Sequence, residues 1–246
     1  MDLTTIAAMA LLFALAAALY SSVGHGGASA YLAVMALFSI APATMRPTAL
    51  ALNLLVAGFG AWRYWRRGLT NWKLLLAFAA AATPAAFIGG AIELPEVYYR
   101  PLVGALLWIA ALRLLWQPAQ LADRPVEAPS LLVSLPTGAA LGLLAGLTGT
   151  GGGIFLSPLI ILLAWEQPRR TSGIAAAFIF LNSAAGLAGN WASVGALPSE
   201  LPIFLGSVAV GALLGTWLGV ERLPRAWLLR TLGLVLLIAG AKLLFA

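Results

Sequence analysis

Two glycine-rich motifs, residues 22–27 (SVGHGG) and 148–153 (TGTGGG), carry the strongest chemical signal in this sequence. A short apolar stretch follows each motif directly, so each motif predicts a backbone break at the N-terminus of a helix. Free backbone N–H groups and the positive end of the helix dipole favour a bound anion at such a terminus. Glycine also permits positive φ angles and lets an anion approach the backbone closely. The two motifs therefore predict a site for a small anion.

Polar side chains in and near the motifs add hydrogen-bonding groups to this predicted site. Thr148 and Thr150 offer neutral hydroxyl donors, and we expect no fixed basic residue beside the glycines. Asn53 and Asn182 are amides inside apolar stretches, which either line a site or bond across helices. The predicted substrate-binding residues are Ser22, Gly24, His25, Gly26, Gly27, Asn53, Thr148, Gly149, Thr150, Gly151, Gly152, Gly153, Asn182 and Ser183.

His25 is the single histidine of the chain and lies inside the first motif. One interpretation is a neutral ring that is hydrogen-bonded to the backbone. The other is a group that titrates near neutral pH and either binds the anion or couples transport to protons. Thr150 takes its place in the second motif, so a symmetric site does not require the histidine.

Some glycines of this chain have a simpler explanation, because small residues four apart let membrane helices pack closely. This explanation suits Gly138 with Gly142, and Gly211 with Gly215. It suits the consecutive glycines at 151–153 poorly, because adjacent glycines break a helix. We therefore assign the spaced pairs to packing and the two motifs to a site.

The composition excludes several classes of protein. With no Cys, one His and eight Asp plus Glu, the chain cannot build a cysteine nucleophile, a disulfide scaffold, a zinc ribbon or an iron–sulfur site. No Lys-Ser or Lys-Thr follows the glycines, so a Walker-type phosphate loop is excluded. The 14 basic residues form no patch for nucleic acid. We expect neither enzymatic activity nor a cofactor or metal.

Hydrophobic residues make up 62% of the 246 residues and charged residues only 9%, whereas soluble domains carry roughly 25% charged residues. Ten apolar stretches are separated by glycines, prolines or short charged loops. They cover residues 4–22, 28–41, 47–62, 74–92, 97–116, 131–148, 153–165, 171–192, 202–220 and 226–245. Their length and Leu/Ala content predict an all-α, polytopic integral membrane protein. We assign the first stretch to the mature structure, because no basic segment precedes it as in a signal peptide.

An internal repeat divides the chain into residues 1–116 and 131–246, joined by a polar linker at 117–130. The glycines at 24, 26 and 27 match those at 149, 151 and 152 at an offset of 125. Farther along, Asn53, Gly60 and Trp62 match Asn182, Gly189 and Trp191 at an offset of 129. Repeats in membrane proteins are typical of transporters with a site between the halves.

The basic residues predict how the halves are oriented. If the segments flanking each glycine motif enter and return, eleven basic residues lie on one side of the membrane and three on the other. The eleven are Arg63, Arg66, Arg67, Lys73, Arg113, Arg124, Arg169, Arg170, Arg222, Arg225 and Arg230; the three are Arg46, Arg100 and Lys242. If each flanking pair crosses once, the split is even. The positive-inside rule favours the first arrangement, which predicts inverted repeats of about five segments, cytoplasmic loops at 63–73 and 166–170, and both termini outside.

The length of the stretch at 153–165 places the second motif at depth. Its 13 residues rise about 20 Å as a helix, against a hydrocarbon core of about 30 Å. Both motifs should therefore lie within the membrane, as re-entrant or half helices whose exposed backbone is buried in protein or lines a wet cavity. Arg46 and Arg170 begin equivalent helices and are interpreted either as surface anchors or as gates that attract the anion.

Over residues 5–245 the chain resembles the sulfite exporter TauE/SafE family, also called the toluene sulfonate uptake permease family. The resemblance rests on the duplicated architecture, on residues 22–27 (SVGHGG) and 146–153 (GLTGTGGG), and on the Asn in the helix after each motif. It implies a multi-pass transporter of the bacterial inner membrane for small sulfur-containing anions such as sulfite, sulfonates or sulfoacetate, often an exporter. Members differ in substrate, so the resemblance selects no single anion.

These features predict a secondary transporter that holds its anion between two helix N-termini and works by alternating access between the halves. The expected partners are the small anion, the lipid bilayer and protons as a candidate coupling ion, but not nucleic acid. Two alternatives stay open: an anion channel with the same site, and a transporter of another small organic anion. No ATP-binding domain is present, so the chain by itself cannot be a primary pump.

Overall fold

The computed structural model describes residues 1–22, 25–115, 125–191, 195, 197–218 and 225–245. Ten α-helices and no strands occur in these residues, which confirms the predicted all-α class. The helices are α1 (Leu3–Ser22), α2 (Ala28–Leu37), α3 (Pro42–Arg66), α4 (Trp72–Ala91), α5 (Glu96–Leu115), α6 (Leu131–Thr148), α7 (Gly153–Leu162), α8 (Pro168–Gly189), α9 (Leu201–Leu218) and α10 (Arg225–Phe245). Each corresponds to one predicted apolar stretch.

Four of the described helices, α1, α4, α6 and α8, are long and apolar enough to cross a membrane. Large apolar side chains also cover the outside of the bundle. Leu132 is 88% exposed, Leu76 59% and Ile238 60%, and water would make such a surface unfavourable. A lipid environment explains it, so the chain is a multi-pass membrane protein.

Spaced glycines bring two pairs of helices into direct backbone contact. On α6, a Cβ added to Gly138 or Gly142 would lie 2.3 or 2.0 Å from the carbonyl oxygen of Phe78 or Ala82 on α4. On α9, Gly211 and Gly215 approach Ala14 and Ala18 of α1 in the same way. Residue numbers rise together along both contacts, so α4 runs parallel to α6 and α1 runs parallel to α9. The predicted packing role of these four glycines is confirmed.

Helices at equivalent places in the sequence repeat pack against each other in opposite directions. Along α3 and α8, Gly58 faces Phe180 and Gly60 faces Ala176. Along α5 and α10, Gly104 faces Gly240, while Gly233 faces Ala111. Adding the repeat offset of 129 to Gly104 and Ala111 gives Gly233 and Gly240, so one contact becomes the other when the halves are exchanged.

The other large helix–helix contacts are also related to each other when the two halves are exchanged. α4 packs against α6 as α9 packs against α1, and α2 packs against α3 as α7 packs against α8. The halves therefore do not fold as separate bundles. Each contributes helices to the other, and α3 and α8 cross at the centre between them.

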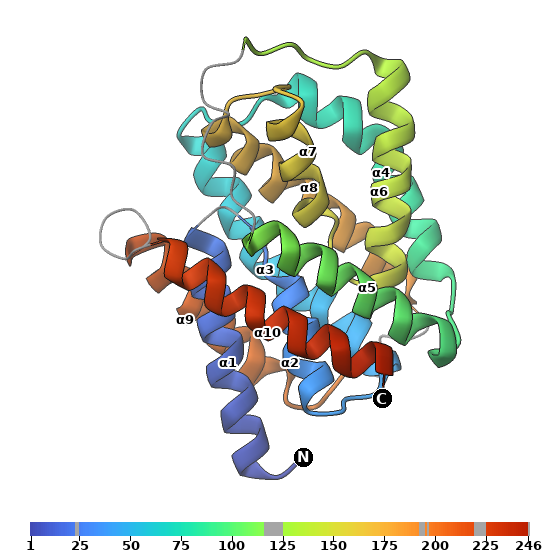
Figure 1. Ribbon diagram of the computed structural model, residues 1–246, viewed down its shortest axis with the longest axis vertical. Coiled ribbons are helices and arrows are strands. Elements are labelled where there is room, and N and C mark those ends of the chain that lie inside the picture. Colours follow the sequence, from blue (N-terminus) through green and yellow to red (C-terminus); the bar gives the residue numbers. More distant parts are fainter. Residues whose placement is uncertain (23–24, 116–124, 192–194, 196, 219–224, 246) are drawn as a thin grey trace.

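The loop after α3 and the loop before α8 lie together at one end of the molecule. Asn71 Nδ2 donates to Glu166 Oε2 at 2.6 Å, and the Glu127 amide donates to the carbonyl oxygen of Ala164 at 3.1 Å. The 20 residues of α4 separate this end from residues 92–95 by about 30 Å. Both chain termini lie at the opposite end, at the bottom of Figure 1. The loops at 63–73 and 166–170 thus lie at one end of the molecule and the chain termini at the other.

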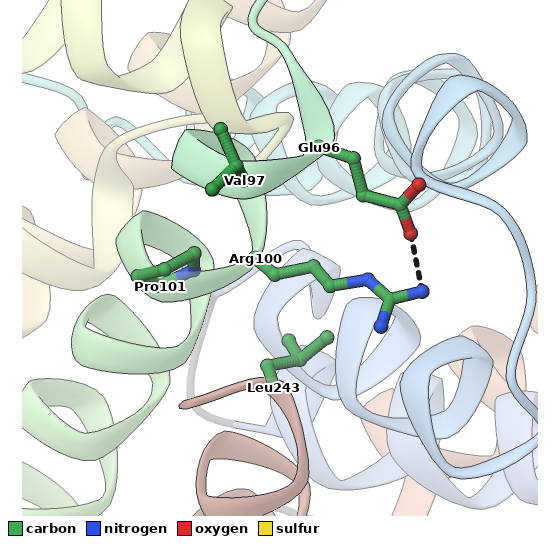
Figure 2. A pocket seen from close by; sticks show the side chains of 5 residues that line it. All are labelled: Glu96, Val97, Arg100, Pro101 and Leu243. Carbon is green, nitrogen blue, oxygen red and sulfur yellow. Dashed lines mark ion pairs between the residues drawn. The ribbon is translucent and has the colours of Figure 1, made fainter. Parts of the chain in front are cut away.

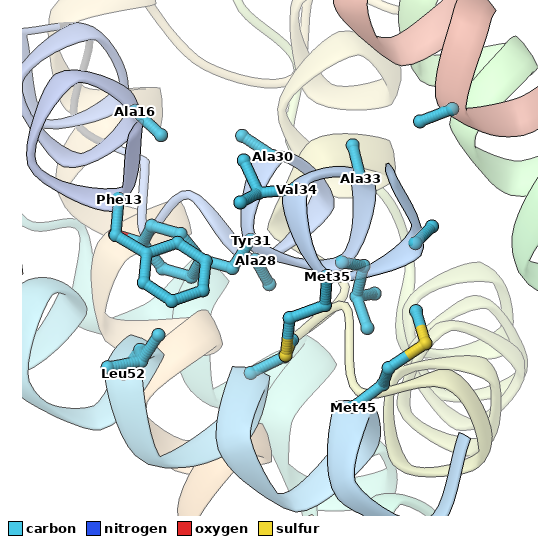
Figure 3. Close-up of a cluster of buried hydrophobic side chains, with 14 of the residues drawn as sticks. Phe13, Ala16, Ala28, Ala30, Tyr31, Ala33, Val34, Met35, Met45 and Leu52 are labelled. Atoms are coloured by element: carbon cyan, nitrogen blue, oxygen red, sulfur yellow. The ribbon is translucent and has the colours of Figure 1, made fainter. Parts of the chain in front are cut away.

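Each short helix belongs to its own apolar core. α2 packs into a cluster with side chains from α1, α3, α5, α9 and α10. Figure 3 shows part of this cluster, with Phe13 of α1 beside Tyr31 of α2, and Met35 above α3. A second cluster joins α7 to α4 and α8 through Phe78, Leu156 and Phe178. The cores hold α2 and α7 in place and thereby position the glycine motifs before them.

Candidate anion-binding site

Each glycine motif ends in a left-handed residue that starts a short helix. Gly27 has φ 100° before α2, and Gly152 has φ 77° before α7. Both helices have ten residues, and no side chain of the described residues caps either N-terminus. The first N–H groups of a helix have no intrahelical acceptor. The predicted helix starts are confirmed, and both present backbone donors and the positive end of a dipole.

The two motifs meet at one amide side chain. A Cβ added to Gly26 would lie 2.5 Å from Asn53 Oδ1, and one added to Gly151 would lie 2.7 Å from Asn53 Nδ2. Ile179 of α8 also lies against both glycines, since its Cγ2 would be 3.0 and 2.9 Å from the two added atoms. Residues more than 120 positions apart in the sequence therefore converge where α3 crosses α8.

Polar groups on the inner face of α8 complete this meeting point. Ser183 Oγ would lie 3.2 Å from a Cβ on Gly151 and accepts a hydrogen bond from Asn53 Nδ2 at 3.5 Å. Asn182 is fully buried, and neither of its amide atoms has a hydrogen-bond partner among the described residues. The Oδ1 of Asn53 lacks a partner there too. Buried polar atoms without partners are uncommon in proteins and mark this region as a candidate site.

The threonines of the second motif bond mainly to their own segment. Thr148 Oγ1 donates to the carbonyl oxygen of Leu144 at 2.6 Å and lies 3.0 Å from Thr150 Oγ1. A hydroxyl has one proton to donate, so Thr150 is the donor within this pair. Both hydroxyl protons are therefore used, one on Leu144 and one on Thr148, so these two threonines offer an anion no free hydroxyl donor.

The remaining predicted residues belong to the motifs themselves. Gly149 and Gly153 pack against Arg46 and Ile179, respectively. His25 is half-buried, and its backbone N–H donates to the carbonyl oxygen of Tyr20 at 2.9 Å. Gly24 and the side chain of Ser22 lie outside the described residues.

Arg46 corrects two sequence-based expectations. It is only 6% exposed, so it is no surface anchor. Its Cγ would lie 3.2 Å from a Cβ on Gly149, so a basic residue does stand beside the second motif. The guanidinium points to other oxygen atoms, donating to the carbonyl oxygens of Ile92 and Gly90 at 2.7 Å each and to Asn190 Oδ1 at 2.6 Å.

These acceptors show what Arg46 does. They lie at the C-terminal ends of α4 and α8, where helix dipoles are negative and carbonyl groups lack intrahelical partners. Arg46 therefore ties the start of α3 to the ends of two helices. Arg170, which begins α8, is exposed and fits the surface-anchor interpretation.

An open pocket lies elsewhere, where the start of α5 meets the end of α10 (Figure 2). Val97, Pro101 and Leu243 form its apolar part, and Glu96 forms an ion pair with Arg100 beside them. None of these residues belongs to the glycine motifs. We therefore do not assign this pocket to the candidate anion site.

Sequence reasoning missed three residues that support the motifs. Tyr31 donates its hydroxyl to the carbonyl oxygen of Gly26 at 2.9 Å, and Tyr99 donates to that of Thr148 at 3.1 Å. Ile179 separates the motifs from α8. Its position three residues before Asn182 places it on the same helix face, so periodicity could have found it. Nothing in the sequence pairs Tyr99 with Thr148.

Comparison with known proteins agrees with this architecture. The profile of the family described as sulfite exporter TauE/SafE matches residues 9–243. The chain is 38% identical to "Probable membrane transporter protein y4hK" of Sinorhizobium fredii, over 96% of this chain and 97% of that protein. It is 26% identical to "Probable membrane transporter protein YjnA" of Bacillus subtilis, over 92% and 95% of the two chains. No solved structure matches. Since the family profile covers nearly the whole chain, this protein belongs to the sulfite exporter TauE/SafE family of membrane transporters.

Proposed function

We propose that this protein is a secondary transporter, working as an exporter in the bacterial inner membrane, for small sulfur-containing anions such as sulfite, sulfonates or sulfoacetate. The observation that carries the proposal is the approach of Gly26 and Gly151 to the same amide, that of Asn53. Two uncapped helix N-termini then serve one site. Neutral donors suit a transported anion, because a fixed cation would hold it too tightly for release. The sulfur chemistry rests on the family to which the chain belongs.

The helix directions support inverted repeats. α3 and α8 are equivalent in the sequence repeat and cross the centre in opposite directions, and the equivalent helices α5 and α10 also pack in opposite directions. A pseudo-two-fold axis in the membrane plane produces this arrangement, with the site at the interface of the repeats. Alternating access then moves the helices of one half against those of the other while the anion stays between the motifs.

A panel of anions on the purified protein tests the proposal. Sulfite, thiosulfate, sulfoacetate, taurine, sulfate and acetate are compared by thermal shift, since a ligand stabilises the folded state by mass action. We expect preferential stabilisation by one or more of the sulfur anions. Saturable counterflow in liposomes would support a carrier, whereas a channel would give none.

Glycine variants connect that binding to the motifs. In Gly151→Ala the new methyl group would collide with Asn53 Nδ2 at 2.7 Å. In Gly27→Ala and Gly152→Ala, both at positive φ, it would lie 2.7 Å from the Tyr31 hydroxyl and 3.1 Å from the Phe178 ring, directly at the helix starts. We expect these variants to weaken anion binding at least about tenfold, corresponding to about 1.4 kcal/mol. Gly68→Ala is the matched control, because Gly68 also has positive φ (65°) but no atom within 4 Å of its added Cβ. Wild-type binding by folded Gly27→Ala and Gly152→Ala would refute the central site.

A further inference from the structure

The unpartnered oxygen of Asn53 restricts which anion the proposed site accepts. Asn53 is fully buried, and its Oδ1 has no donor among the described residues. In the structure Asn53 Nδ2 donates to Ser183 Oγ at 3.5 Å, which leaves Oδ1 on the opposite side of the amide. An added Cβ on Gly26 would lie 2.5 Å from Oδ1, so this oxygen faces the backbone of the first motif. The site thus contains a hydrogen-bond acceptor as well as backbone donors.

An amide oxygen and an anionic oxygen repel each other, because both carry negative charge and neither brings a proton. A ligand with its own O–H or N–H group would instead donate to Asn53 Oδ1. That bond would satisfy a group whose burial without a partner is unfavourable. The side chains nearest to Gly26 and Gly151 are Asn53, Ile179 and Ser183, none of which is charged. The guanidinium of Arg46 donates to oxygen atoms at the ends of α4 and α8 instead.

We infer that the site selects a singly charged oxyanion that carries its own hydrogen-bond donor, and that Asn53 Oδ1 accepts from this donor. The anionic end lies at the uncapped starts of α2 and α7, and the donor points to α3. This inference rests on the proposed function and adds to it the chemical class of the substrate. Sites built to bond a substrate hydroxyl discriminate strongly against analogues without it, because the protein group is then left unpaired.

The test compares 2-hydroxyethanesulfonate with ethanesulfonate, two monoanions that differ by one hydroxyl group. Binding to the purified full-length protein is measured by calorimetry at one pH. We expect 2-hydroxyethanesulfonate to bind at least about tenfold more tightly, the effect of one hydrogen bond of about 1.4 kcal/mol. Equal affinities would overturn the inference while leaving the proposed function in place. If neither sulfonate binds and no other sulfur anion does, the proposed function itself fails.

The variant Asn53→Leu then tests whether Asn53 Oδ1 is the group that accepts from the ligand's donor. The variant should bind both sulfonates with affinities within about threefold of each other, a level near that of ethanesulfonate in the wild type. Its retained ethanesulfonate binding also shows that it is folded; if it does not purify as a single species, Asn53→Ala replaces it. Persistent discrimination, or loss of both ligands, would overturn the assignment to Asn53. Thr48→Val is the control, since Thr48 Oγ1 is an equally buried and unpartnered group on α3, and it should discriminate as the wild type does.

Discussion

The two short helices, α2 and α7, have equivalent places in the repeat but different surroundings. Nine of the ten residues of α2 are buried, whereas four residues of α7 are. α2 packs against α1, α3, α5 and α10, while α7 packs against α8, against α5 and, through its apolar cluster, against α4. Thus α2, which α10 covers, is more enclosed than α7, its equivalent in the second half.

This difference shows that similar sequences need not have identical packing in a two-fold arrangement. Under the proposed alternating access of inverted repeats, exchanging the arrangements of the halves generates the opposite-facing state. We therefore expect α7 to become enclosed and α2 to open in the other state. Three pairs of positions on the two halves, Arg46 with Arg170, His25 with Thr150, and Val34 with Leu159, allow this comparison to be tested.

The largest effect is expected for Arg46, which is buried, against Arg170, which is exposed. Arg46→Met removes three short hydrogen bonds to a charged donor, each worth about 1.5–3 kcal/mol. We expect a total loss of about 3–5 kcal/mol, because such contributions are not additive. Arg170→Met should change stability by less than about 0.5 kcal/mol. Thermal unfolding followed by tryptophan fluorescence measures both, and equal melting temperatures would show that Arg46 does not hold the helix ends together.

Thr150 tests whether the second motif faces the anion. Thr150→Asp places a negative charge beside the start of α7, and repulsion in a poorly solvated site should weaken anion binding by at least about a hundredfold. Thr150→Val loses only the hydrogen bond to Thr148 and should weaken binding by less than about tenfold. Isothermal titration of folded protein distinguishes them. Similar affinities for the two variants would place the anion away from this motif.

Single cysteines compare the surroundings of α2 and α7 directly, because the chain has no native Cys. Val34 is 4% exposed, and its equivalent Leu159 is half-buried. We expect Leu159→Cys to react with a small thiol reagent at least about tenfold faster than Val34→Cys, since local opening governs access to buried sites. Mass spectrometry of timed samples gives the two rates. Faster reaction at position 34 would mean that the protein in solution favours the opposite state.

His25 is expected to give the smallest effect, because the second motif does without a histidine. His25→Ala should lower anion transport a few fold or change its pH dependence. Uptake into liposomes at several pH values measures this, with monodisperse elution as the control for folding. Transport like that of the wild type at every pH would leave His25 a purely structural role.

The helices could be predicted from the sequence because glycines, prolines and charged loops interrupt long apolar stretches. α2 begins at Ala28 and α7 at Gly153, as the motifs indicate. The end of α7 was predicted less well. The helix stops at Leu162 rather than near Trp165, and Ala164 takes a left-handed conformation with φ 53°. Such a turn in an apolar segment has no glycine or proline to reveal it.

The sequence by itself determined the membrane class, the ten helices, the duplication and the two helix starts, because these depend on local composition and on spacing along the chain. Only the tertiary structure decided which polar groups meet. Asn53 lies against both Gly26 and Gly151. The buried side chain of Arg46 donates hydrogen bonds to the ends of α4 and α8. Hydrophobic periodicity cannot decide this, because these helices are apolar on nearly every face. Their rotation and register are set by close packing at glycines such as Gly142 and Gly240, whose partners lie 60 or more residues away.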